Sequence, residues 1–294
     1  MTRRGWLLFA AMCFLWGIPY LLIKVAVEDL APSVIVLART GIGALVLLPV
    51  ALARGYLRQL LPLWRWLVLF SVLEIGGPWL LLTDAERHIS SSLAGLLIAA
   101  VPLVSALASH LLGSEDRVDA GRLLGIGVGI AGVAVLLGLD LHGEVGAALE
   151  IALVVIGYGT APQIITHKFV GIPSIAVISS SLSVAALMYL PLAVAQWPTE
   201  VPRAKVVWSL AGLALACTVV AFLVFFALIA EVGPNRATII TFINPAVALG
   251  LGVLLLDESF TVGIAVGFPL VLLGCYLSTR TSKALEPMPA VAEA

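Results

Sequence analysis

Two charged side chains lie inside long apolar runs, where charge is costly to bury. Arg39 is about six residues into the run 33–53, and Glu74 is near the middle of the run 64–83. A buried arginine can anchor a solute carboxylate or close an outer gate, or it can reach an interface and pin loops. A buried glutamic acid can couple transport to protons, or it can be a structural hydrogen-bonding group.

Aromatic and amide side chains in the same runs could contact a solute. Trp16 and Tyr20 are four residues apart, which places them on one face of a helix beside Pro19. Tyr158 and Gln163 occupy the corresponding part of a later run. A role in packing helices together is the alternative for each of them. The predicted substrate-binding residues are Trp16, Tyr20, Arg39, Glu74, Trp79, Tyr158, Gln163 and Asn244.

Four prolines inside the runs predict interrupted helices, because proline has no N–H group to donate. An interrupted membrane helix can expose carbonyl groups to a solute and can flex during gating. We expect this behaviour at Pro19, Pro102, Pro162 and Pro245.

Motifs of catalytic, metal and nucleotide sites are absent from the sequence. There is no P-loop lysine, no HExxH and no GxSxG. Residues 127–132 match GxGxxG, but no strand precedes them and the apolar run continues, which excludes a dinucleotide site. Cys13, Cys217 and Cys275 are far apart in apolar runs and are interpreted as core residues. We therefore expect no enzyme activity, no cofactor and no metal.

The elements that must position these residues are membrane helices. Of the 294 residues, 61% are hydrophobic and 11% are charged, against about 45–50% and about 25% in soluble domains. Each apolar run approaches the ~20 residues that cross a bilayer. We predict an all-α integral membrane protein with ten transmembrane helices near 6–26, 33–53, 64–83, 89–112, 121–139, 146–166, 174–196, 206–230, 236–256 and 261–279.

The distribution of charge predicts orientation and partners. Segments assigned to the inside hold most of the lysines and arginines, so both termini are expected in the cytoplasm. The segment 283–294 is rich in Pro, Ala and Glu and predicts a disordered cytoplasmic tail. A net charge of −1 without a basic domain excludes nucleic acid as an expected partner. The lipid bilayer and a small-molecule solute are the expected partners.

An internal repeat divides the chain. Pro19 and Pro162 are separated by the same 143 residues as Pro102 and Pro245. Each half would hold five helices, at 1–140 and 144–282, and an odd number inverts the second half in the membrane. Inverted repeats favour alternating access, in which one half rocks against the other around a site near the midplane.

The sequence resembles EamA-type members of the drug/metabolite transporter superfamily. The resemblance rests on FLWGIPYLLIK, APSVIVLARTGIGALVLL and SSLAGLLIAAVPLVSAL in the first half and PNRATIITFINPAVAL in the second. It implies a ten-helix fold in the inner membrane, a central cavity lined mainly by helices 1–4 and 6–9, and efflux of amino acids or related metabolites. Arg39 matches an arginine often found in the second helix of this family.

The predicted function is a secondary transporter, most simply an exporter, of small metabolites such as amino acids. Proton coupling through Glu74 and facilitated diffusion are both open, and the alternative is a membrane channel or a scaffold. Glycines such as Gly121, Gly125 and Gly129 permit close helix contact, which serves dimerisation and intramolecular packing equally well.

Overall fold

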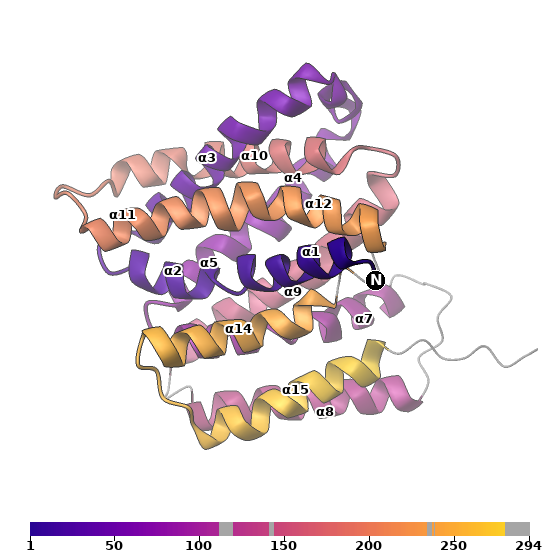
Figure 1. Cartoon of the computed structure of the whole chain (residues 1–294), viewed down its shortest axis with the longest axis vertical. Coiled ribbons are helices and arrows are strands. Elements are labelled where there is room, and N and C mark those ends of the chain that lie inside the picture. Colours follow the sequence, from indigo (N-terminus) through magenta and orange to yellow (C-terminus); the bar gives the residue numbers. More distant parts are fainter. Residues whose placement is uncertain (112–119, 141–143, 234–236, 238, 280–294) are drawn as a thin grey trace, which may run out of the picture.

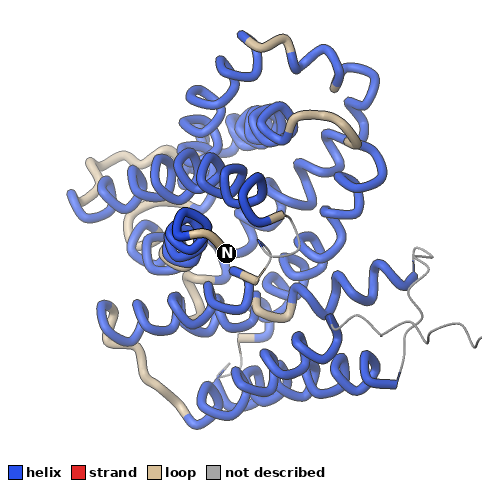
Figure 2. Tube along the Cα trace, turned by 45° about the vertical axis from the view of Figure 1, so that its right-hand side comes forward, coloured by secondary structure: helices blue, strands red, loops and turns tan. Residues whose placement is uncertain are grey.

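The computed structural model describes residues 1–111, 120–140, 144–233, 237 and 239–279, which form a bundle of helices running in similar directions (Figures 1 and 2). The described residues contain no strand. The first-half helices are α1 (Arg3–Leu15), α2 (Pro19–Ala26), α3 (Pro32–Ala53), α4 (Trp64–Ser71), α5 (Gly77–Ala85), α6 (Ser91–Ile98), α7 (Val101–Leu111) and α8 (Ala120–Asp140). The second-half helices are α9 (Val145–Lys168), α10 (Ser174–Ala195), α11 (Ala204–Ala211), α12 (Ala221–Val232), α14 (Ile240–Leu255) and α15 (Val262–Thr279).

Within the described residues, seven continuous or nearly continuous helical stretches are long and apolar enough to cross a membrane. Three further apolar helices among the described residues are shorter. Backbone groups in hydrocarbon must be paired within the chain, and helices meet that requirement. The predicted all-helical membrane protein is therefore confirmed at this level. The predicted tail at 283–294 lies outside the described residues. The seven longer stretches are Arg3–Ala26, Pro32–Ala53, Leu61–Ala85, Ser91–Ala108, Val145–Lys168, Ser174–Ala195 and Ala204–Val232.

Only two of the four prolines coincide with a break in a helix. A turn separates α1 from α2 just before Pro19, and another separates α6 from α7 just before Pro102. The helix continues through Pro162 in α9 and through Pro245 in α14. The interruptions expected at these two positions are thus not present. A proline removes one hydrogen bond, and a long membrane helix packed by its neighbours tolerates that loss.

The closest helix pairs join the two halves of the chain. The pairs are α3 with α10, α5 with α9, α6 with α14, and α8 with α15. α8 and α15 lie side by side along the lower edge of Figure 1. A Cβ atom added to Gly274 would lie 2.3 Å from the backbone nitrogen of Gly129, and one added to Gly125 would lie 2.5 Å from that of Ser278. Gly125 and Gly129 of α8 therefore permit close packing against α15 within one chain.

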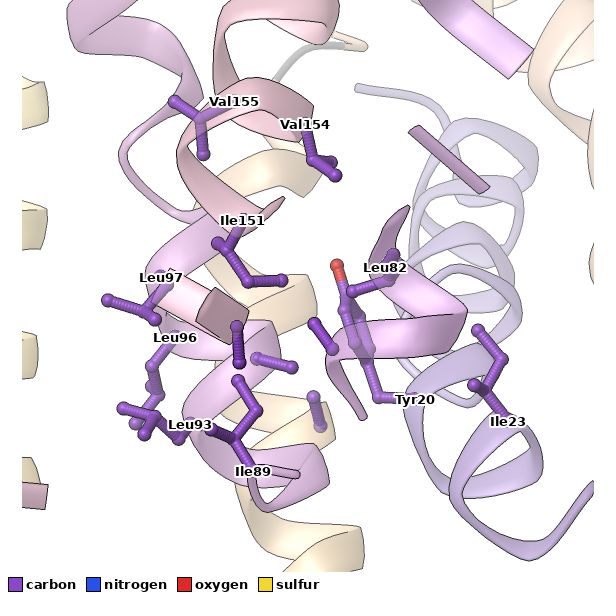
Figure 3. Close-up of a cluster of buried hydrophobic side chains, with 14 of the residues drawn as sticks. Tyr20, Ile23, Leu82, Ile89, Leu93, Leu96, Leu97, Ile151, Val154 and Val155 are labelled. Carbon is purple, nitrogen blue, oxygen red and sulfur yellow. The ribbon is translucent and has the colours of Figure 1, made fainter. Parts of the chain in front are cut away.

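The largest apolar core lies between α2, α5, α6 and α9. Figure 3 shows Tyr20 between Ile23 on one side and Leu93 and Ile151 on the other, next to Leu82. A second core, around Phe70 and Trp79, joins α3, α5 and α10. Tyr20 belongs to the first core and Trp79 to the second, and both side chains also lie near Arg39, so the two cores meet at this arginine.

Candidate functional site

Arg39 is buried in the centre of the bundle. It lies on α3, and 7% of the residue is exposed. Its guanidinium lies over the indole ring of Trp79, 3.6 Å from the ring centroid. Its Nε donates a 2.9 Å hydrogen bond to Oγ1 of Thr218. Within the described part of the chain no carboxylate lies within 4.0 Å of this guanidinium. The direct contacts of this buried positive charge described here are thus with neutral groups, which leaves it able to bind an anion.

Two tyrosines surround the same guanidinium. Tyr20 from α2 and Tyr158 from α9 both interact electrostatically with Arg39 and with each other. The hydroxyl of Tyr158 also lies beside the indole N–H of Trp79. Tyr20, Arg39, Trp79 and Tyr158 therefore come together from four different helices.

Glu74 lies at the edge of this cluster on a π-helical segment, Val72–Gly76, between α4 and α5. Its carboxyl group interacts electrostatically with Tyr158. Oε2 of Glu74 is buried, and no group in the described residues donates a hydrogen bond to it. π-Helical segments often occur at functional sites, because the extra residue in the turn redirects a side chain.

The partner of Arg39 also comes from a π-helical segment, Gly212–Val220, between α11 and α12. The hydroxyl of Thr218 accepts the hydrogen bond from Arg39 and donates to the carbonyl of Leu213 at 2.9 Å. Sequence reasoning missed Thr218. A threonine in an apolar run was the only signal, and it does not reveal which helix the side chain faces.

The remaining predicted residues have contacts outside the cluster. Trp16 packs against Phe225 and Phe222 of α12, with ring centroids 4.7 and 6.0 Å apart. The amide nitrogen of Asn244, in its favoured orientation, donates to the carbonyls of Cys13 and Ile240. Gln163 is half-buried on α9, more than one turn beyond Tyr158. These contacts tie α1 to α12 and α14.

Polar contacts between the two halves gather at one end of the bundle, which we call the latch end. It is formed by the C-terminal ends of α2, α5 and α14 and by the N-terminal ends of α3 and α6. The carboxylate of Glu258, between α14 and α15, accepts hydrogen bonds from the backbone N–H and the hydroxyl of both Ser91 and Ser92. Oγ of Ser33 donates to Gln196 at 2.7 Å.

Ion pairs close the same end at the surface. The Arg203 guanidinium bonds to the carboxylates of Asp29 and Glu28, and Nζ of Lys205 lies 2.6 Å from Glu28. The hydrogen bonds from Arg203 lower the pKa of Asp29, and the hydrogen bond from Lys205 is the main cause that lowers the pKa of Glu28. The bond to Asp29 in turn raises the pKa of Arg203.

A cavity of about 610 Å³ lies at the latch end and does not reach the Arg39 cluster. The described residues place no three His, Cys, Asp or Glu side chains where they could hold a metal ion. The cavity is lined by Val27, Asp29, Leu30, Ala31, Pro32, Ser33, Leu80, Leu81, Asp84, Arg87, Glu150, Leu192 and Gln196.

Known proteins match the chain along nearly its whole length. The inner membrane transporter YedA of Escherichia coli is 27% identical over 91% of this chain and 90% of its own. The transporter YoaV of Bacillus subtilis is 24% identical over 92% of this chain and 95% of its own. One solved crystal structure aligns with 95% of this chain and 97% of its own chain, with a TM-score of 0.66. Its sequence identity is 20%, so this likeness shows the fold alone.

The family model of EamA-like transporters matches residues 3–138 and again residues 146–280. Together with the apolar helices and the relatives named as transporters, this match identifies a multi-pass membrane transporter and confirms the predicted resemblance. The chain belongs to the EamA-like transporter family.

Proposed function

We propose that this transporter exports small metabolites that carry a carboxylate, such as amino acids, as a secondary transporter. The observation that carries the proposal is Arg39, a guanidinium 7% exposed and without a carboxylate partner among the described residues. A carboxylate that reached it could form two parallel hydrogen bonds, an arrangement for which arginine is well suited.

The aromatic residues around Arg39 would hold the rest of the solute. Trp79 already lies against the guanidinium, and Tyr20 and Tyr158 offer ring faces with hydroxyl groups. Trp16, Gln163 and Asn244 would line the outer part of the path. Such a mixture of apolar walls and few polar groups is typical of small-molecule sites.

The proposed mechanism is alternating access between two inverted repeats. Ten helices would cross the membrane, five from 1–140 and five from 144–282, with both termini in the cytoplasm. Packing of α3 on α10, α5 on α9 and α6 on α14 supports this arrangement, because each pair takes one helix from each half. Flexing at Pro19 and Pro102, where helices break, would open one side at a time, with Pro162 and Pro245 in the matching positions.

Protons would provide the driving force through Glu74. Its buried Oε2 lacks a hydrogen-bond donor among the described residues, and a neutral carboxyl group is the more stable form in such a place. Interaction with Tyr158 connects Glu74 to the proposed binding cluster, so solute and proton could influence each other. Without proton coupling through Glu74, the same alternating-access mechanism would carry out facilitated diffusion of the solute.

The test uses purified protein in liposomes loaded with amino acids, their decarboxylated amines and related carboxylates. Saturable efflux of the carboxylates, with no efflux of the amines, is the expected result. A pH gradient should change the rate in the wild type and not in Glu74→Gln. Conductance that rises linearly with voltage and without solute selectivity would identify a channel and overturn the proposal.

A further inference from the structure

A second buried acid, Glu86, lies at the latch end and has no role in the proposed binding site. It is the first residue after α5 and lies between the predicted spans 64–83 and 89–112, yet none of it is exposed. No donor among the described residues forms a hydrogen bond with either of its carboxyl oxygens. A carboxylate in that position would lose its hydration without any replacement, which favours the neutral acid.

The ionisable groups that face Glu86 come from each element around it. Tyr20 and Lys24 belong to α2, Arg39 belongs to α3, and Glu258 lies between α14 and α15. Burial is the main cause that raises the pKa of Glu86 well above its ordinary value, and the negative charge of Glu258 raises it further. Lys24 and Arg39 act in the opposite direction.

Lys24 does not neutralise Glu86 by a direct ion pair. Its Nζ donates to the backbone carbonyls of Glu86 at 2.6 Å and of Ile89 at 2.7 Å. The ammonium group thus fixes the turn between α5 and α6, and the carboxyl group of Glu86 remains without a donor. That turn leads directly into Ser91 and Ser92, which bind Glu258 from the other half.

The contact between Glu258 and the two serines is closely fitted. A Cβ atom on Gly252 would lie 2.3 Å from Oε2 of Glu258 and from Oγ of Ser92, so only glycine permits the approach. Both serines are completely buried, and Asp257 holds a positive φ of 54° that turns Glu258 towards them. Opening of the latch end would break these four hydrogen bonds and expose Glu86 to water.

We propose that Glu86 is a proton-binding site that controls the latch: the latch end is closed when Glu86 is protonated and opens when Glu86 ionises. Ionisation would place a second negative charge near Glu258 in a buried region, and separation of the halves would relieve both the repulsion and the lost hydration. The inference rests on the proposed alternating access. It assigns proton control of one gate to Glu86, which is separate from Glu74.

Pulsed electron resonance between spin labels at His88 and Phe260 can test the proposal. Both positions are exposed and lie on opposite sides of the latch, and the three buried native cysteines would be replaced by alanine. In lipid nanodiscs the distance should be short at pH 5 and should shift to a longer population by pH 9. Glu86→Gln should keep the short distance throughout. Glu200→Gln, an exposed acid in the segment before α11 that forms none of the latch contacts, is the control that should follow the wild type.

Infrared spectra provide an independent readout of the proton. In the closed state the protonated-carboxyl band should contain a component from Glu86 that is missing in Glu86→Gln, whereas the component from Glu74 should remain. An unchanged pH profile or an unchanged band in Glu86→Gln overturns the inference. If that variant does not fold, Glu86→Leu decides, because an apolar side chain of similar size cannot ionise either and should also keep the short distance up to pH 9. A pH-dependent distance without solute flux would support the latch and reject the transport proposal, whereas flux with a pH-independent distance would reject only the latch.

Discussion

The proposed carboxylate group of the solute depends mainly on one buried arginine. Arg39 combines deep burial, a cation–π contact with Trp79 and one neutral hydrogen-bond acceptor. An arginine in a structural ion pair would be neutralised by an acid. Among the described residues no carboxylate lies within 4.0 Å of this guanidinium, and its nearest acidic influence, Glu86, acts without an ion pair, so a bound anion could supply the close partner.

Replacing Arg39 by glutamine should raise the KM for a carboxylate solute by roughly 10- to 100-fold. A hydrogen bond to a charged group contributes about 1.5–3 kcal/mol, and about 1.4 kcal/mol corresponds to a factor of ten. Initial rates of uptake into proteoliposomes measure the effect. Arg87→Gln, an exposed arginine paired with Asp84, is the control and should leave KM unchanged. Equal KM values in both variants would contradict solute binding by Arg39.

Thr218→Ala should lower the stability of the protein, because Nε of Arg39 loses its acceptor in a buried place. The expected decrease in the free energy of unfolding is about 1–3 kcal/mol. Denaturant titration in detergent measures it, and Thr218→Ser should restore most of the loss. Thr160→Ala is the matched control, since the Thr160 hydroxyl bonds only within its own helix. A similar loss in both variants would mean that Arg39 does not depend on Thr218.

Sequence reasoning found the residues that are unusual for their surroundings. Arg39 and Glu74 stood out as charges in apolar runs, and the structure brings both near Tyr158. It missed Thr218 and Glu86. A hydroxyl in an apolar helix is common, and a loop acid is normally solvated, so neither type reveals burial or contact with a distant segment.

At the scale of elements, the apolar runs predicted the helices well but not their irregularities. Helix breaks occur before Pro19 and Pro102, whereas α9 and α14 continue through Pro162 and Pro245. Two π-helical segments, Val72–Gly76 and Gly212–Val220, had no recognisable signal in the sequence. They depend on tertiary contacts, and both carry a residue of the Arg39 cluster.

The close packing of α8 on α15 gives an element-scale prediction. Gly274→Ala should destabilise the protein by about 1–3 kcal/mol, because the new methyl group meets the backbone of Gly129 and must push the helices apart. Gly127→Ala is the control on the same helix pair, since nothing lies within 4 Å of its added Cβ atom. Thermal unfolding in detergent compares the two. Equal melting temperatures would show that the pair separates without cost.

At the scale of the whole molecule, two groups of ionisable residues act on the latch end, and their effects on its closure change in opposite directions with pH. Glu28 and Asp29 have lowered pKa values, so their ion pairs stabilise closure above their ordinary pKa and lose that effect as the pH falls through the lowered value. Glu86 has a raised pKa, so its contribution to closure is present at low pH and disappears as the pH rises through the raised value.

The opposite directions of these pKa shifts predict that the latch end is closed at intermediate pH and open at lower and at higher pH. The acid limit lies below about 4, because the ordinary pKa values of aspartic and glutamic acid are about 3.9 and 4.3 and both are lowered here. The alkaline limit is set by Glu86. The distance between spin labels at His88 and Phe260, measured from pH 3 to pH 9, should be shortest in the middle. Arg203→Gln should weaken the acid limb alone, since only the ion pair between Glu28 and Lys205 would then remain to be lost, and Glu86→Gln should remove the alkaline limb alone. If either variant removed both limbs, the two groups of contacts would not act separately, and the latch end would respond to pH as a single unit.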